Sequence, residues 1–181
     1  MRLREYPGFL PGLAFSIVLA FIFAGRLGRS LRVSRAIAWG LIFGVGIIVA
    51  ATLTPGGGVF RSGAEGSGAC DLTRLSLAPL REVLRFGETG LNVLLFVPLG
   101  VAIGSMPGSR SKVALILTAI AFPFAIEAAQ LVFTVLDRQC QSADVIDNLT
   151  GLAIGLAIGT LMHVALGRRH AHRDSDASPT S

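Results

Sequence analysis

Charged side chains are scarce in this chain. Only 15% of its 181 residues are Asp, Glu, Lys or Arg, whereas a soluble domain has about 25%. Lys112 is the single lysine, so arginine carries almost all of the positive charge behind the net +5. Hydrophobic residues make up 52% of the chain and stand in long runs. The shortage of charge argues against a soluble domain and favours a lipid environment.

The residue types that carry most enzyme chemistry are also few. The chain has two cysteines and three histidines, and two of those histidines, His170 and His172, offer too few ligands for a metal ion. No Ser–His or Cys–His pairing is evident, and His163 lies toward the opposite side from the other polar residues. The sequence assigns no catalytic residue, metal or cofactor. The basic residues are not interleaved with aromatics, which argues against nucleic-acid binding.

Five apolar segments are candidates for crossing a bilayer, which takes about 20 helical residues. They cover about residues 9–24, 36–53, 90–106, 113–136 and 149–166. The first is short, but Tyr6 and Arg26 could reach the two interfaces and extend it. The sequence therefore predicts an all-α fold, a polytopic transmembrane helical bundle of about five spans within residues 1–167.

Arginines beside these segments predict the orientation. The loop over residues 25–35 carries four of them: Arg26, Arg29, Arg32 and Arg35. The positive-inside rule keeps such a loop in the cytoplasm. The N-terminus and the loops 54–89 and 137–148 then lie outside, and the C-terminus is cytoplasmic. We expect a multi-pass protein of the cell membrane with a disordered cytoplasmic tail over residues 168–181.

Small residues at four-residue spacing indicate where helices approach closely in lipid. Gly151, Gly155 and Gly159 follow this spacing in the fifth segment. The stripe favours helix packing within one bundle, with a dimer interface as the alternative. The sequence does not predict the oligomeric state.

Glu127 is the most informative polar residue. It lies inside the fourth segment, where an ionised carboxylate costs a few kcal/mol unless it is paired, protonated or hydrated. Gln130 shares its helical face, and Arg138 is the one basic residue in the loop that follows. The rest of this predicted polar cluster stands where the third and fifth segments begin: Asn92, Asp144, Asp147 and Asn148. Helix capping or a hydrogen bond between helices is the alternative role for these side chains.

These residues form an ordered motif. Residues 92–100 read NVLLFVPLG, and an apolar element with one proline precedes them at residues 77–80. Downstream stand Glu127 and Gln130, then Arg138, then Asp144, Asp147, Asn148 and Gly151. The series resembles the N-x-L-L-F-x-P-L-G, E-x-x-Q, R, D-x-x-D-N and G pattern of the VanZ-like membrane proteins, over about residues 73–159. The resemblance implies a multi-pass bacterial membrane protein. The family's namesake is associated with low-level resistance to teicoplanin, a glycopeptide antibiotic with a fatty-acyl tail.

Cys70 and Cys140 fall in the two loops expected outside. A disulfide can persist in an oxidising compartment, and chain entropy alone would make this one worth about 4 kcal/mol. The sequence leaves both states of the cysteines open, the disulfide and the two free thiols.

Three functions are compatible with these features. We favour a non-enzymatic envelope protein whose polar site binds an amphiphile at the outer leaflet, such as a lipid-linked wall precursor or a lipoglycopeptide, with membrane lipids around it. The alternatives are an intramembrane enzyme acting on a lipid-linked substrate and a structural or partner-binding membrane protein. Alanine substitutions at Arg138 or Asp147 would test the favoured reading.

Overall fold

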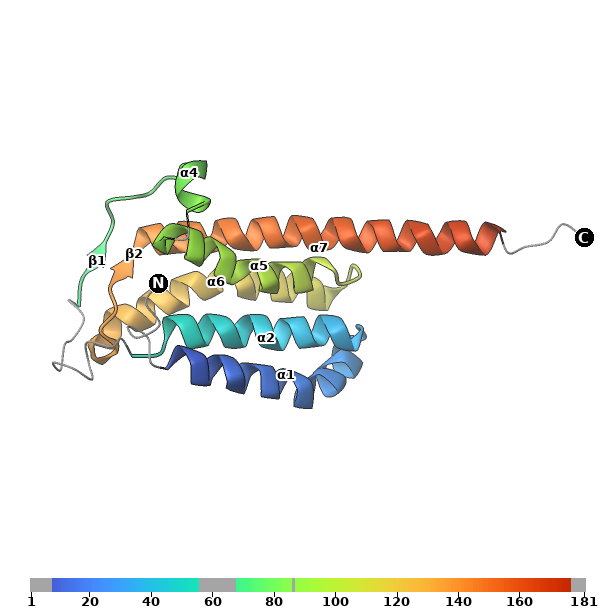
Figure 1. The fold of residues 1–181 in the computed structure, drawn as a ribbon, viewed down its shortest axis with the longest axis horizontal. Helices are drawn as coiled ribbons and strands as arrows, with labels where there is room; N and C mark the ends of the chain where they lie inside the picture. Colours follow the sequence, from blue (N-terminus) through green and yellow to red (C-terminus); the bar gives the residue numbers. More distant parts are fainter. Residues whose placement is uncertain (1–7, 56–67, 86, 177–181) are drawn as a thin grey trace, which may run out of the picture.

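The protein is a bundle of helices that run side by side, seen in a computed structural model that describes residues 8–55, 68–85 and 87–176 and side chains as far as Arg168 (Figure 1). The long helices are α1 (Phe9–Leu31), α2 (Arg35–Thr52), α5 (Glu88–Gly104), α6 (Arg110–Val132) and α7 (Ser142–Asp176). Four of them are long and apolar enough to cross a membrane, and α5 is a shorter apolar helix of 17 residues. At about 1.5 Å per residue α5 is about 25 Å long, which is the lower limit for a span. The predicted all-α bundle is confirmed.

Helices α1 and α2 form an antiparallel hairpin whose turn is shorter than the sequence predicted. The first span was expected to end near residue 24, but α1 continues to Leu31. Arginine is a good helix former, and positive charge near a helix C-terminus is favourable. Arg32 then ends the helix in the left-handed conformation, with φ at 55°. Ser34 starts α2 by accepting a hydrogen bond from the backbone N–H of Ile37 at 3.3 Å.

Helix α5 lies in the middle of the bundle, with contacts to α2 on one side and α7 on the other. Its Phe96 and Ile103 are buried in an apolar core with Ile48 of α2 and Ile126 of α6. Pro98 lies inside α5 and Pro123 inside α6. The Lys112 ammonium donates to the carbonyl oxygens of Gly104 and Met106, both at 2.8 Å, and so satisfies acceptors where α5 ends.

The predicted glycine stripe lies between α5 and α7. A Cβ atom added at Gly151, Gly155 or Gly159 would collide with a carbonyl oxygen of α5, on Val93, Val97 and Val101 respectively. Gly100 of α5 fits in return against Gly155, where an added Cβ would lie 2.9 Å from the Cα atom. The two helices run parallel at close backbone contact, which suits Cα–H···O contacts. The stripe therefore serves packing within the bundle.

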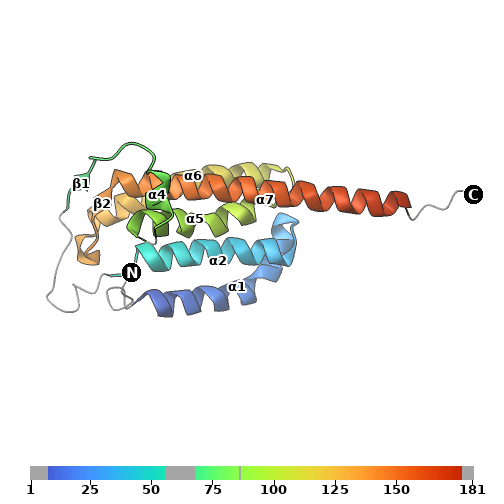
Figure 2. The same cartoon turned by 45° about the horizontal axis from the view of Figure 1, so that its top comes forward.

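Two more segments, the fourth and the fifth, have boundaries that differ from those expected. α6 ends at Val132 and is followed by the 3-10 turn η2 (Thr134–Leu136), whereas the fourth span was expected to reach residue 136. α7 begins at Ser142 instead of near residue 149, and it is helical as far as Asp176, over residues expected in a disordered tail. Apolar character marks only the middle of α7. Acidic residues such as Asp144 are favoured in the first turn of a helix, and arginine, a good helix former, extends its C-terminal end. Both views show α7 projecting well beyond the other helices (Figures 1 and 2).

The loop expected over residues 54–89 contains two short elements. β1 (Cys70–Asp71) pairs in parallel with β2 (Cys140–Gln141), and α4 (Leu80–Val83) is a single turn of helix. Residues 56–67 and 86 lie outside the described residues. We call the end of the bundle that carries these elements the strand end. α5 and α7 begin there, and α2 and α6 end there (Figure 1).

Candidate functional site

The two cysteines hold the strand end together. Cys70 of β1 and Cys140 of β2 are joined by a disulfide across 70 residues of sequence. The bridge lies in the paired strands themselves, because Cys70 is also the register partner of Cys140. It therefore fixes the segment after β1 beside the first turns of α7.

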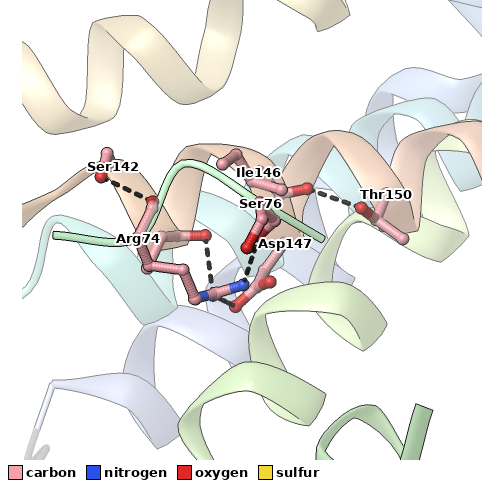
Figure 3. A network of polar contacts seen from close by, with 7 residues as sticks. Arg74, Ser76, Ser142, Ile146, Asp147 and Thr150 are labelled. Atoms are coloured by element: carbon pink, nitrogen blue, oxygen red, sulfur yellow. Dashed lines mark hydrogen bonds and ion pairs between the residues drawn. The ribbon is translucent and has the colours of Figure 1, made fainter. Parts of the chain in front are cut away.

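That segment carries Arg74, whose side chain reaches over α7 to Asp147 (Figure 3). One guanidinium nitrogen, Nη2, lies 2.6 Å from Asp147 Oδ2 and 3.2 Å from the carbonyl oxygen of Ala143. The other, Nη1, donates to the carbonyl oxygen of Ser76 at 3.1 Å. Ser142 in turn donates its hydroxyl to the carbonyl oxygen of Arg74 at 2.8 Å. The Asp147 side chain is only 2% exposed and that of Arg74 is 25% exposed, so the aspartate is the buried partner of this ion pair.

A polar cavity of about 220 Å³ opens beside this ion pair. Three carboxylates and one guanidinium line it, from Asp71, Glu88, Asp144 and Arg74, together with uncharged residues: Thr73, Thr89, Gln141 and Ala143. Asn92 forms a side-chain hydrogen bond with Asp144. The backbone N–H of Thr73 donates to Asp71 Oδ1 at 2.8 Å and lowers the pKa of that exposed carboxyl. The cavity is thus rich in hydrogen-bond acceptors, with carboxylates in excess over cations.

Glu127 lies next to this cavity, behind β2. It is 6% exposed, and its Oε2 accepts a hydrogen bond from the backbone N–H of Gln141 at 2.6 Å. Glu127 also interacts electrostatically with Asp144. Gln141 therefore connects Glu127 to the cavity, because its backbone N–H donates to the Glu127 carboxylate and Gln141 is also one of the cavity-lining residues.

Gln130 and Arg138 bind the C-terminal end of α2. Gln130 Nε2 donates to the carbonyl oxygen of Thr52 at 3.0 Å. Arg138 Nη2 donates to the carbonyl oxygens of Ala51 at 2.8 Å and Thr54 at 3.3 Å. The last carbonyls of a helix have no partner within it, and a cation suits the negative end of its dipole. Both side chains thus join the site to the α1–α2 hairpin.

Two buried acceptors in this region have no hydrogen-bond partner among the described residues: Gln130 Oε1 and Asn148 Oδ1. An unmet buried acceptor costs about 1–3 kcal/mol. Among all the residues that the structure describes, no three His, Cys, Asp or Glu side chains form a group that could hold a metal ion.

A family model described as VanZ/LLP1 matches residues 41–163, about two thirds of the chain. The chain belongs to the VanZ/LLP1 family. No curated protein and no solved structure matches it significantly. The VanZ/LLP1 match begins earlier than the resemblance at residues 73–159 and includes α2 from residue 41 onward, with the C-terminal end to which Gln130 and Arg138 bind.

The residues of the predicted polar cluster lie at the strand end, in two neighbouring groups. Asn92, Asp144 and Asp147 lie with Arg74 at the start of α7, whereas Glu127, Gln130 and Arg138 connect α6 and its following loop to β2 and α2. Asn148 follows Asp147 and is 2% exposed.

Arg74 is the functional residue that the sequence analysis missed. Arg138 was the arginine considered for the carboxylates, but the ion-pair partner of Asp147 is Arg74. The signal lay in the cysteines. Arg74 follows Cys70 by four residues and Asp144 follows Cys140 by four, so a bridge between the cysteines would have placed this arginine beside these acids.

The disulfide supports a prediction about stability. Replacing Cys70 and Cys140 by serine should lower the free energy of unfolding by about 2 kcal/mol, the low end of the range for native bridges. The expected loss is smaller than the value of about 4 kcal/mol from chain entropy alone. The reason is that α5 and α6 lie between the cysteines, and their insertion in lipid already restricts the unfolded chain. Unfolding by sodium dodecyl sulfate in mixed micelles, followed by circular dichroism, would measure it. Free Cys70 detected by thiol labelling in intact cells would contradict the bridge itself.

Proposed function

We propose that this VanZ/LLP1 protein is a non-enzymatic membrane protein that binds the headgroup of an envelope amphiphile in the cavity at the strand end. The observation behind the proposal is the cavity itself, a pocket of three carboxylates and a guanidinium at the ends of apolar helices. Two buried carboxylates, Glu127 and Asp147, stand beside this cavity, and ionisable groups buried in membrane proteins are costly and mark functional sites. The Cys70–Cys140 disulfide and the Arg74–Asp147 ion pair attach the segment after β1, which lines the cavity, to the start of α7.

We further propose that the strand end faces outward in the cell membrane. Positive side chains gather at the opposite end of the bundle: Arg26, Arg29, Arg32, Arg35, Arg110, Lys112 and Arg168. The positive-inside rule assigns that end to the cytoplasm. A disulfide at the strand end agrees with this orientation, because disulfides persist on the oxidising side. The N-terminus is then outside and the C-terminus cytoplasmic.

The lining of the cavity favours a particular ligand chemistry. Its carboxylates outnumber its guanidinium, and that guanidinium is already paired with Asp147. Hydroxyl, amide and ammonium groups would find acceptors there, whereas a bare phosphate would meet repulsion. About 220 Å³ is smaller than a pocket for a drug-sized molecule. The cavity therefore suits part of a sugar or peptide headgroup, as in a lipid-linked wall precursor or an acylated glycopeptide.

An Asp144→Asn substitution tests this proposal. In a host strain that carries this gene, the variant should lose the glycopeptide protection that the wild-type gene gives, as fully as the deletion does, because it removes a cavity carboxylate without changing the size of the side chain. Glu82→Gln on α4 is the matched control, since it removes a carboxylate at the same end outside the cavity lining. The measurement is susceptibility to teicoplanin and to the same glycopeptide core without its acyl tail, with binding to purified protein in nanodiscs alongside.

Equal susceptibility of the wild-type, deletion and Asp144→Asn strains, with no binding of either compound, would overturn the proposed ligand. Turnover of a labelled lipid-linked precursor by the purified protein would overturn the non-enzymatic assignment in favour of an intramembrane enzyme.

A further inference from the structure

A row of exposed leucines lies on the segment between β1 and α5, which we call the leucine arm (residues 72–85). Leu72, Leu75, Leu77, Leu80 and Leu84 are each 65–75% exposed. Isolated exposed leucines are ordinary on a protein surface, but five within 13 residues form an apolar patch that calls for a partner. Within the arm only Leu80–Val83 is helical, and Pro79 directly precedes this turn of helix.

The arm is fixed to the bundle at both ends. Near its start, Arg74 is paired with Asp147 in the second turn of α7. Near its end, the carbonyl oxygens of Val83 and Arg85 lie directly against Gly90, where an added Cβ would collide with them. Only glycine at this position allows the arm to approach the first turn of α5 so closely.

These two attachments set the depth of the arm. Gly90 is two residues inside α5 and Asp147 is five residues inside α7, so both are about 3–8 Å from the helix start at 1.5 Å per residue. Figures 1 and 2 show α4 beside the first turns of α5 and α7, at the side of the bundle. The leucines are therefore held level with the ends of apolar helices, which is the level of the lipid headgroups.

The charge of the arm identifies the kind of surface it fits. Arg81 and Arg85 are exposed and alternate with the exposed leucines of α4 and its C-terminus. Leucines with neighbouring arginines are typical of segments that lie in the interface of an anionic bilayer. A protein partner is the other class of occupant, but the position beside spanning helices favours lipid.

We propose that the leucine arm docks in the headgroup region of the bilayer, with its leucines at the acyl boundary and its arginines on anionic phosphates. It forms an interfacial anchor at the side of the polar cavity, whose lining residues Thr73 and Arg74 belong to the same arm. The inference does not depend on the cavity having a ligand. Tryptophan quenching tests the docking of the arm, whereas susceptibility and ligand binding test the proposed function. Either proposal can therefore fail without the other.

The test uses the full chain in vesicles of phosphatidylcholine and phosphatidylglycerol. Trp39 is the single tryptophan and is replaced by phenylalanine, so that one new tryptophan reports its own position. Leu77→Trp, Leu80→Trp and Leu84→Trp should each lose most of their fluorescence to lipids brominated near the headgroup, with a blue-shifted emission. Leu117→Trp, on the exposed face of α6, is the positive control, and Gln139→Trp, exposed beside the disulfide, is the aqueous control.

The arginines are tested by comparing brominated phosphatidylglycerol with brominated phosphatidylcholine. The fluorescence of Leu84→Trp should be quenched more strongly by the anionic lipid, because each arginine should raise the local preference for it over phosphatidylcholine by a factor on the order of five. The added changes Arg81→Gln and Arg85→Gln should abolish that preference. Iodide quenching of all three arm positions as strong as that of Gln139→Trp, with no quenching by bromolipid, would overturn the docking. Equal quenching by the two lipids would overturn the assigned role of the arginines.

Discussion

Arg74→Ala should lower the free energy of unfolding by about 3–5 kcal/mol, the usual loss when one partner of a buried ion pair is removed. The variant would leave the Asp147 carboxylate, 2% exposed, without its cation in a region of low dielectric constant. It would also remove the side-chain donor to the carbonyl oxygens of Ala143 and Ser76. Among the described residues, the leucine arm would then keep only the hydrogen bond from the Ser142 hydroxyl to the backbone of residue 74 as its polar contact with the start of α7. Sodium dodecyl sulfate unfolding in mixed micelles measures the change.

A double-mutant cycle separates the ion pair from the other contacts of Arg74. Asp147→Asn combined with Arg74→Ala removes the stranded charge, so the double variant should be more stable than Arg74→Ala alone. The interaction between the two changes should be on the order of 2 kcal/mol for groups in direct contact. Additive effects would show that Asp147 is not the residue that needs Arg74.

Gly151→Ala should destabilise the protein by about 3 kcal/mol, and Gly151→Leu should prevent folding, because overpacking a tight interface moves backbone as well as side chains. The added Cβ would collide with the carbonyl oxygen of Val93. That atom belongs to the backbone of α5 and cannot turn away, so the two helices must separate. The loss would be measured by the same unfolding assay and by the yield of monodisperse protein in detergent.

Gly167→Ala is the matched control on the same helix. A Cβ at this position meets nothing within 4 Å, so the substitution should be neutral or stabilise α7 by up to about 1 kcal/mol through helix propensity. If Gly151→Ala were as well tolerated as Gly167→Ala, close packing of α5 on α7 would be contradicted.

The sequence predicts the bundle well because lipid is a simple solvent. Every backbone polar group in hydrocarbon must be satisfied within its own helix, so an apolar run of sufficient length means a helix. The ends are harder to predict, because hydropathy stops where polar residues begin while the helix continues. Arg26 and Arg29 extend α1 beyond the apolar run, and Ser142 begins α7 seven residues before it.

The sequence predicts the acidic and amide residues of the candidate site better than it predicts the cation, Arg74. Glu127 stands inside an apolar segment, where charge is costly, and Asp144 and Asp147 stand where the next segment begins, so their places along the chain single them out. Arg74 stands in a loop without periodicity, and no local pattern relates it to α7. Only a contact between distant segments, such as the Cys70–Cys140 bridge, contains that information.

The position of this bridge has a consequence for biogenesis. Cys70 and Cys140 are separated by the hairpin of α5 and α6, so they lie on the same face of the membrane only when the two helices cross it together or not at all. A chain with one of these helices left behind during translocation would keep its two thiols apart and its Arg74 away from Asp147. Oxidation of the pair therefore excludes a nascent chain in which only one helix of this hairpin has crossed the membrane.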